Sequence, residues 1–106
     1  LALGDIGKYF PPEKSQWKDS NSLRLLEQVM ELINQHGWVV VNVDTVLIAE
    51  RPKLKSYIHS MQKNLAEKMQ LDIERVGVKA TTNEGLGPEG LEEGISCHAV
   101  VLLERS

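Results

Sequence analysis

Cysteine is nearly absent from this chain, because Cys97 is the only one among its 106 residues. No disulfide can therefore form within the chain, which favours a reducing compartment and predicts a cytoplasmic protein. Cys97 lies inside an apolar run at residues 95–103. We expect it to be a small buried core residue and not a nucleophile.

Positive charge is not in excess, since 12 Lys and Arg stand against 15 Asp and Glu, a formal net charge of −3. No nucleic-acid partner is expected, because such a partner requires a basic stripe. The local basic clusters around Lys8 and Lys53 suit a small anionic ligand instead. Long apolar runs are lacking as well, and no stretch approaches the length of about 20 residues that spans a bilayer, so no membrane partner is expected.

Metal-ligand spacings are also missing from the chain. The three histidines, His36, His59 and His98, occur in no His-x-His, Asp-x-His or His-Glu-x-x-His pattern. We therefore expect structural roles for all three. A Ser-His-Asp or Cys-His catalytic arrangement cannot be assembled from the sequence either.

What the chain does contain is the pattern of one folded domain over residues 1–106. Its apolar fraction of 42% and charged fraction of 25% are ordinary for globular proteins. Apolar residues recur at helical spacing over residues 22–35, where Ser20 or Asn21 can cap the helix, and again over residues 54–70. Residues 1–10 resemble the end of a helix that runs into a Gly-Asp-Ile-Gly turn. Because this apolar stretch starts without Met, we expect a fragment that lacks its true N-terminus.

Three strands are predicted, at residues 38–49, 76–82 and 95–103. With the helices they favour an α+β fold, a two-layer sandwich with a mixed sheet and helices on one face. Strict alternation along the first strand places Val40, Val46 and Ile48 on the face away from the helices. That face also carries Asn42 and Asp44, so it is either solvated or buried against another subunit. We expect burial in an oligomer, because the face is too apolar for water.

The polar segment at residues 79–93 is the most informative part of the chain. A strand delivers Thr81, Thr82 and then Glu84 to the mouth of a glycine-rich loop. Threonine hydroxyls and main-chain N–H groups can donate to phosphate oxygens, and a carboxylate can hold a divalent cation.

Two other polar segments lie next to predicted helices or strands. On propensity alone residues 4–7 favour a common turn without a functional role. Residues 49–55 could be only a strand-to-helix connection, although Lys53 at that turn could bind phosphate.

Several segments occur together in a specific order. They are Gly-Asp-Ile-Gly-Lys-Tyr-Phe-Pro at residues 4–11, Asn-Val-Asp at 42–44, Ala-Glu-Arg-Pro-Lys at 49–53, Lys-Ala-Thr-Thr-Asn-Glu at 79–84 and Glu-Gly-Ile-Ser-Cys-His-Ala at 93–99. This set resembles the 2-C-methyl-D-erythritol 2,4-cyclodiphosphate synthase family over essentially the whole chain, and the cyanobacterial members most. The resemblance implies a homotrimer with active sites between adjacent subunits. It also implies a phosphorus–oxygen lyase that cyclises a cytidine diphospho substrate, with zinc and a second divalent ion, magnesium or manganese, as cofactors.

The resemblance further implies roles for individual residues. Thr82 is the expected catalytic residue, which stabilises the transition state, and Glu84 is expected to approach the second metal ion. The methylerythritol part of the substrate is expected at Asp5, Ile6, Gly7, Phe10, Pro11, Pro12, Glu13 and Lys14. The cytidine and its phosphates are expected at Ala49, Glu50, Arg51, Pro52, Lys53, Leu54, Lys55, Thr81, Thr82, Asn83 and Glu84.

The chain also departs from the family pattern. Pro12, Gly85, Pro88 and Leu91 replace residues that are common in the family, so no role is transferred to the last three. The family's zinc ligands are expected upstream of Leu1, which predicts that the fragment is inactive and that the full-length protein is the enzyme. A non-catalytic nucleotide-binding or oligomerising module is the alternative reading of the chain as it stands.

Overall fold

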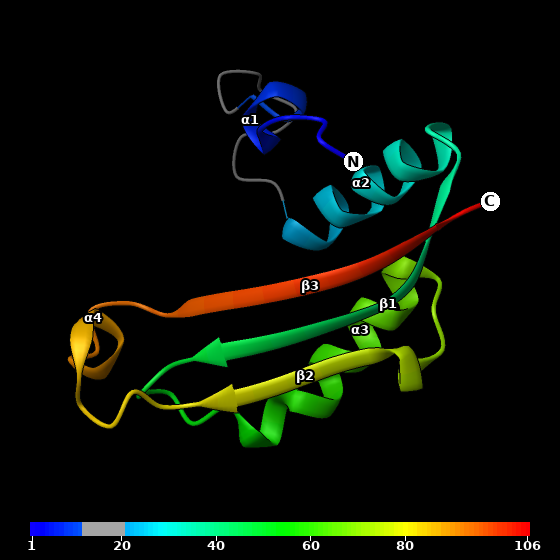
Figure 1. Ribbon diagram of the computed structural model, residues 1–106. Coiled ribbons are helices and arrows are strands. Elements are labelled where there is room, and N and C mark those ends of the chain that lie inside the picture. Colours follow the sequence, from blue (N-terminus) through cyan, green and yellow to red (C-terminus); the bar gives the residue numbers. More distant parts are fainter. Residues whose placement is uncertain (12–20) are drawn as a thin grey trace.

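A three-stranded mixed sheet with two helices on one face forms the framework of the protein (Figure 1). The structure is a computed structural model that describes residues 1–11 and 21–106. In chain order the elements are α1 (Ile6–Tyr9), α2 (Ser22–Gln35), β1 (Trp38–Ile48), a 3-10 turn (Lys55–Tyr57), α3 (Ile58–Met69), a 3-10 turn (Ile73–Arg75), β2 (Val76–Thr81), α4 (Gly87–Gly90) and β3 (Ser96–Arg105). The predicted α+β class and mixed sheet are confirmed.

The order of the strands decides where the loops meet. β1 lies in the centre, parallel to β2 and antiparallel to β3. Ile48 at the end of β1 therefore lies beside Thr81 at the end of β2 and beside Ser96 at the start of β3. The chain that leaves β1, the chain that leaves β2 and the chain that enters β3 consequently share one edge of the sheet.

Local signals account for the boundaries of α2. The Oδ1 atom of Asn21 accepts a hydrogen bond of 2.8 Å from the main-chain N–H of Leu23, which satisfies one of the free donors of the first turn. At the other end the Nδ1 atom of His36 lies 2.8 Å from the carbonyl oxygen of Leu32, and Gly37 adopts a φ of 80°. The helix predicted at these residues and a structural role for His36 are both confirmed.

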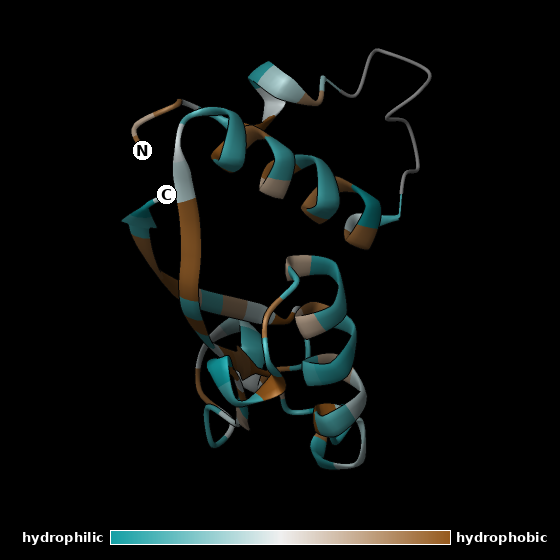
Figure 2. Ribbon diagram, turned by 90° about the vertical axis from the view of Figure 1, so that its right-hand side faces the viewer, coloured by the Kyte–Doolittle hydropathy of each residue, from teal (hydrophilic) through white to brown (hydrophobic). Residues whose placement is uncertain are grey.

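The core lies between the sheet and the two long helices. Figure 2 shows α2 and α3 on the same side of the sheet, with their brown apolar residues turned inward. The second predicted helix is confirmed too, although its first turn is a 3-10 turn and the α-helix begins at Ile58. The buried cluster consists of Val40, Val43, Ala66, Met69, Val76 and Val78, with Leu26, Met30, Ile33, Met61 and Leu65 among the half-buried residues packed against it.

A β-bulge overturns the predicted alternation along β1. Strict alternation placed Val40 on the face away from the helices, but Val40 and Val43 are both only 7% exposed and both join the core. The pairing with β3 shifts between Val40 and Asn42, so that Val41 is the extra residue. An inserted residue reverses the facing of every residue before it.

The face away from the helices carries exposed apolar residues beside polar and charged ones. Val100 and Leu102 are 75% and 55% exposed, and they lie beside Asp44 and Asn42 of β1. The carboxylate of Asp44 forms an ion pair with the ammonium of Lys79 on β2. Within the described residues no helix is long and apolar enough to cross a membrane.

Two further predictions are wrong. The first residues do not continue a helix into a turn: the chain is irregular as far as Asp5 and α1 then begins at Ile6, because Gly4 adopts a φ of 95° that a right-handed helix excludes.

Cys97 is exposed and not buried. It lines an apolar groove with Leu47, Met61 and Leu65, where the helices leave this part of β3 uncovered.

Candidate functional site

Three segments of the chain meet at one edge of the sheet, as the strand order requires. They are the chain after β1, the chain after β2, and α4, which precedes β3 (Figure 1, left side). The main-chain N–H of Ala49 donates to the carbonyl oxygen of Thr81 over 3.0 Å, so β1 and β2 stay paired up to the start of both loops. The loops consequently start from a rigid base.

The carboxylate of Glu50 joins the first two of these segments. Its Oε1 atom accepts hydrogen bonds from the main-chain N–H of Asn83 at 3.0 Å and of Gly85 at 3.1 Å. Hydrogen bonds to an ionised acceptor are stronger than neutral ones. Residues 49–55 and residues 81–84, which are separate in the sequence, are thus brought together by a direct contact between them.

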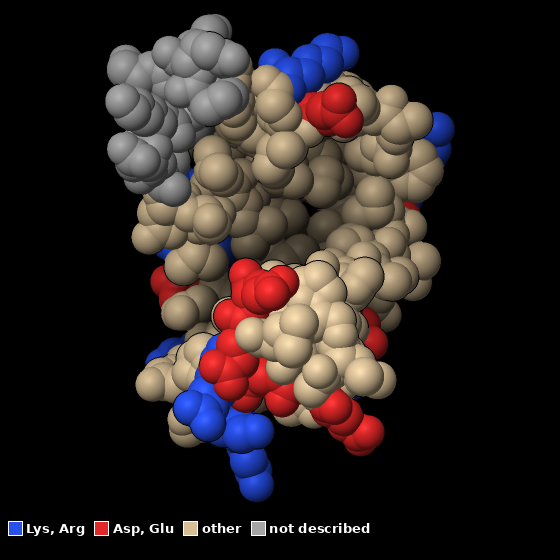
Figure 3. All heavy atoms as spheres, turned by 90° about the vertical axis from the view of Figure 1, so that its left-hand side faces the viewer, with Lys and Arg blue, Asp and Glu red and all other residues tan. Residues whose placement is uncertain are grey.

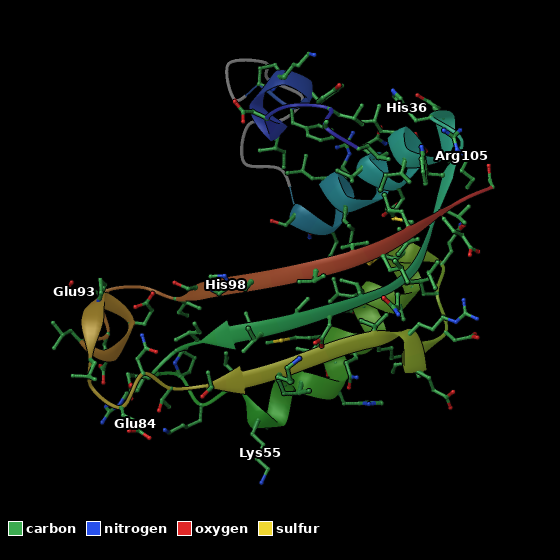
Figure 4. All side chains as sticks on the ribbon, viewed as in Figure 1. His36, Lys55, Glu84, Glu93, His98 and Arg105 are labelled. Atoms are coloured by element: carbon green, nitrogen blue, oxygen red, sulfur yellow. The ribbon has the colours of Figure 1, made fainter. Side chains whose placement is uncertain are left out.

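Thr82 is the first residue after β2, since the strand ends at Thr81 and not at Thr82 as predicted. Its Oγ1 atom accepts a weak hydrogen bond of 3.3 Å from the main-chain N–H of Glu84. Because the oxygen accepts this bond, the hydroxyl proton can be donated to another acceptor, such as a phosphate oxygen. Thr82 is half-buried, whereas the Glu84 side chain is exposed and extends outward from the loop in Figure 4.

Glu89 of α4 makes two contacts that the sequence did not predict. Its Oε2 atom accepts from the side-chain amide of Asn83 at 3.2 Å, and its Oε1 atom accepts from the hydroxyl of Ser96 at 2.6 Å. The hydrogen bond from Ser96, followed by one from the main chain of Glu89 itself, holds the pKa of the Glu89 carboxyl below its ordinary value; Asn83 and His98 act in the same direction. The sequence held one signal for the helix α4 that carries Glu89: Pro88 lies in its first turn, and Pro is favoured at helix starts.

Charged side chains of both signs gather at this end of the molecule, as Figure 3 shows for the face that carries α4. Arg51 forms an ion pair of 3.3 Å with Glu92, in which both side chains are largely exposed. Such a pair contributes little to stability. Lys53 and Lys55 follow Arg51 in the chain, and both are exposed. The side chain of Lys55 extends away from the sheet in Figure 4.

The segment predicted to hold the methylerythritol part lies elsewhere. Asp5, Ile6 and Gly7 are exposed at the start of α1, and Phe10 and Pro11 directly follow the end of this helix. Figures 1 and 2 both place α1 well apart from the loops after β1 and β2. One chain therefore does not unite the two halves of the predicted site. Pro12, Glu13 and Lys14 lie outside the described residues.

The donor groups needed for a complete metal site are not assembled in the described part of this chain. Across residues 1–11 and 21–106, no three side chains of His, Cys, Asp or Glu are grouped so that they could hold a metal ion. Glu84 offers a single exposed carboxylate. A divalent ion at this loop would consequently need further ligands from the substrate, from solvent or from another part of the protein.

Curated proteins and solved structures resemble this chain over nearly its whole length. The chain is 64% identical to the 2-C-methyl-D-erythritol 2,4-cyclodiphosphate synthase of Synechococcus sp. (strain CC9311), over 98% of this chain and 63% of that relative. It thus spans less than two thirds of the relative's length. Solved structures share its fold, including the two that follow. The bifunctional IspDF from Campylobacter jejuni has a TM-score of 0.92 at 38% identity, over 98% of this chain and 28% of that one.

The second is a 2C-methyl-D-erythritol-2,4-cyclodiphosphate synthase in a CDP-bound form, with a TM-score of 0.86 at 33% identity, over 96% of this chain and 65% of that one. Residues 1–104 match the YgbB family, almost the full length of the chain. Together with the identity to the cyanobacterial relative, this match shows that the chain belongs to the YgbB family, whose members include the 2-C-methyl-D-erythritol 2,4-cyclodiphosphate synthases.

Proposed function

We propose that the full-length protein converts 4-diphosphocytidyl-2-C-methyl-D-erythritol 2-phosphate into 2-C-methyl-D-erythritol 2,4-cyclodiphosphate and CMP, as a phosphorus–oxygen lyase of non-mevalonate isoprenoid biosynthesis. We further propose that residues 1–106 form a single domain, which spans 63% of the length of the Synechococcus relative. The observation that carries the proposal is the Glu50 contact, which fastens the expected cytidine segment to the expected phosphate segment. A CDP-bound relative of the same fold supports a cytidine diphospho ligand.

The reaction is an intramolecular phosphoryl transfer. An oxygen of the substrate's 2-phosphate forms a bond to the β-phosphorus, the bond from that phosphorus to the bridging oxygen breaks, and CMP leaves with that oxygen. Positioning and neutralisation of charge supply most of the catalysis in such reactions. Main-chain groups of residues 49–55 orient the cytosine, Lys53 faces the phosphates, and the Thr82 hydroxyl donates to an oxygen that gains charge in the transition state.

Divalent ions, zinc and either magnesium or manganese, complete the proposed catalyst. Bound ions of this kind act as Lewis acids on phosphoryl oxygens. Glu84 is the residue of this chain that we assign to the second ion, because it is the exposed carboxylate that directly follows Thr82 and Asn83. Zinc would need ligands that the described residues of this chain do not group together.

A homotrimer with sites between adjacent subunits accounts for two observations. The α1 half of the site lies apart from the loops after β1 and β2, so α1 of one subunit would complete the loops of the next (Figure 1). The sheet face away from the helices carries the exposed Val100 and Leu102, which a neighbouring subunit would cover.

We propose that the assembled enzyme is cytoplasmic, because residues 1–106 contain a single cysteine and no disulfide can form within them.

The test of this function is release of CMP from the synthetic substrate by the full-length protein with divalent metal. CMP and the cyclic product should form in equal amounts. The competing function is a non-catalytic nucleotide-binding module, which the binding loops of this chain would also suit. Calorimetry with CMP and CDP separates the two: binding that needs no metal, together with an absence of turnover, would favour the module.

Lys53→Ala in the full-length protein is expected to raise the KM for the substrate about tenfold, the effect of losing one charge-assisted hydrogen bond, with a smaller fall in kcat. The reason is that Lys53 is proposed to bind the phosphates in the ground state. Lys63→Ala, an exposed lysine on α3, is the matched control and should leave both constants unchanged. Steady-state kinetics of CMP release measures both; a fall in kcat alone would contradict a ground-state role for Lys53.

A further inference from the structure

The glycine-rich stretch at residues 85–91 has no role in the function proposed above, yet it is closely packed against the residues that do. A Cβ atom on Gly90 would lie 2.4 Å from the carbonyl carbon of Gly85, so the main chain of α4 rests directly on the main chain of the loop after β2. The main-chain N–H of Gly90 also donates to the carbonyl oxygen of Leu86 at 3.1 Å. Both contacts lie within residues 85–90, so they fold the stretch into a compact support that directly follows Asn83 and Glu84.

Glu89 is the side chain through which this support reaches the proposed catalytic residue. One oxygen of the Glu89 carboxylate accepts a hydrogen bond from the side-chain amide of Asn83, which directly follows Thr82. The other oxygen accepts a hydrogen bond from the hydroxyl of Ser96, which is the first residue of β3. All three residues are half-buried. The loop is thereby tied to the rigid start of β3 on one side, while Glu50 ties its main chain to the end of β1 on the other.

We propose that Glu89 is a positioning residue, whose bridge from Asn83 to Ser96 holds Thr82 in the orientation that donates to the phosphoryl group. This inference rests on the proposed function. Glu89 itself does not touch the substrate. It acts because a small displacement of a donor away from its acceptor lowers the rate of a reaction that depends on positioning.

The experiment compares Glu89→Ala, Glu89→Gln and Glu93→Ala in the full-length protein. Glu89→Ala removes both hydrogen bonds and is expected to lower kcat about tenfold, which corresponds to ~1.4 kcal/mol, with KM changed less than about twofold. Glu89→Gln keeps an oxygen for Ser96 and an NH₂ group for a turned Asn83 amide, so its kcat should stay within about threefold of the original. Glu93→Ala removes an exposed carboxylate that follows α4 in the chain, and should change nothing.

Hydrogen exchange of the amides at Gly85 and Leu86 provides a readout that needs no activity. The Gly85 amide donates to the carboxylate of Glu50, which follows β1, and the Leu86 amide donates to the carbonyl oxygen of Asn83 in the same loop. Glu89→Ala should speed their exchange about tenfold, whereas Glu89→Gln and Glu93→Ala should not. An unchanged kcat in Glu89→Ala, or a Glu89→Gln variant as slow as Glu89→Ala, would overturn the bridge. If the unaltered protein releases no CMP, the proposed function fails, and the exchange rates alone then decide the role of Glu89.

Discussion

Thr82→Ala in the full-length protein is expected to lower kcat for CMP release by about 10²- to 10³-fold, the usual effect of removing one donor to a developing oxyanion. The hydroxyl is proposed to act in the transition state, so KM should change little. Its oxygen accepts from the N–H of Glu84 over 3.3 Å, which leaves the proton for the substrate. Steady-state and single-turnover measurements of CMP release give the two constants.

Thr82→Ser is the matched control, since serine keeps the hydroxyl at the same position and should retain most of kcat. A second control is Thr45→Ala. The Thr45 hydroxyl donates to the carbonyl oxygen of Gly77 inside the sheet, so its loss should lower stability by about 1 kcal/mol without a comparable loss of kcat. The role assigned to Thr82 would be wrong if the alanine variant released CMP as fast as the unaltered protein.

The regular elements were predictable because their signals are local. Apolar spacing with a capping Asn21 predicted α2, and β-branched runs predicted the three strands to within a few residues at each end. The facing of Val40 was not predictable, because a bulge depends on how β1 pairs with β3, and pairing is not a local property. The exposure of Cys97 likewise depends on which elements cover β3, not on its apolar neighbours in sequence.

The candidate site shows the same division. Residues 49–55 and 81–84 were identified by their motifs, and the parallel pairing of β1 with β2 brings them together. The hydrogen bonds of Glu50 and Glu89 join residues far apart in sequence or across a turn, and no spacing rule predicts them. The short α4 was missed because its four glycine-rich residues predict an irregular loop more strongly than Pro88 predicts a helix start, although the close approach of two backbones is itself a reason for glycine.

Gly90→Ala tests that close approach and is expected to lower kcat about 10²-fold, as misplacement of a catalytic group by about 1 Å can do. The added Cβ atom would lie 2.4 Å from the carbonyl carbon and 2.9 Å from the Cα atom of Gly85. These are main-chain atoms, so no side-chain rotation relieves the clash. Either α4 or Gly85 must shift, and a shift of Gly85 is expected to displace the loop that carries Thr82.

Gly94→Ala is the matched control, because a Cβ atom there would meet no atom within 4 Å and the residue needs no left-handed conformation. It should retain both kcat and the melting temperature. In Gly90→Ala the melting temperature should fall only slightly, since α4 lies outside the buried cluster. Full activity in Gly90→Ala would mean that the loop tolerates displacement, and the rigid support assigned to residues 85–91 would then be wrong. A large loss of kcat with an unchanged fold would show that this support controls the geometry of Thr82.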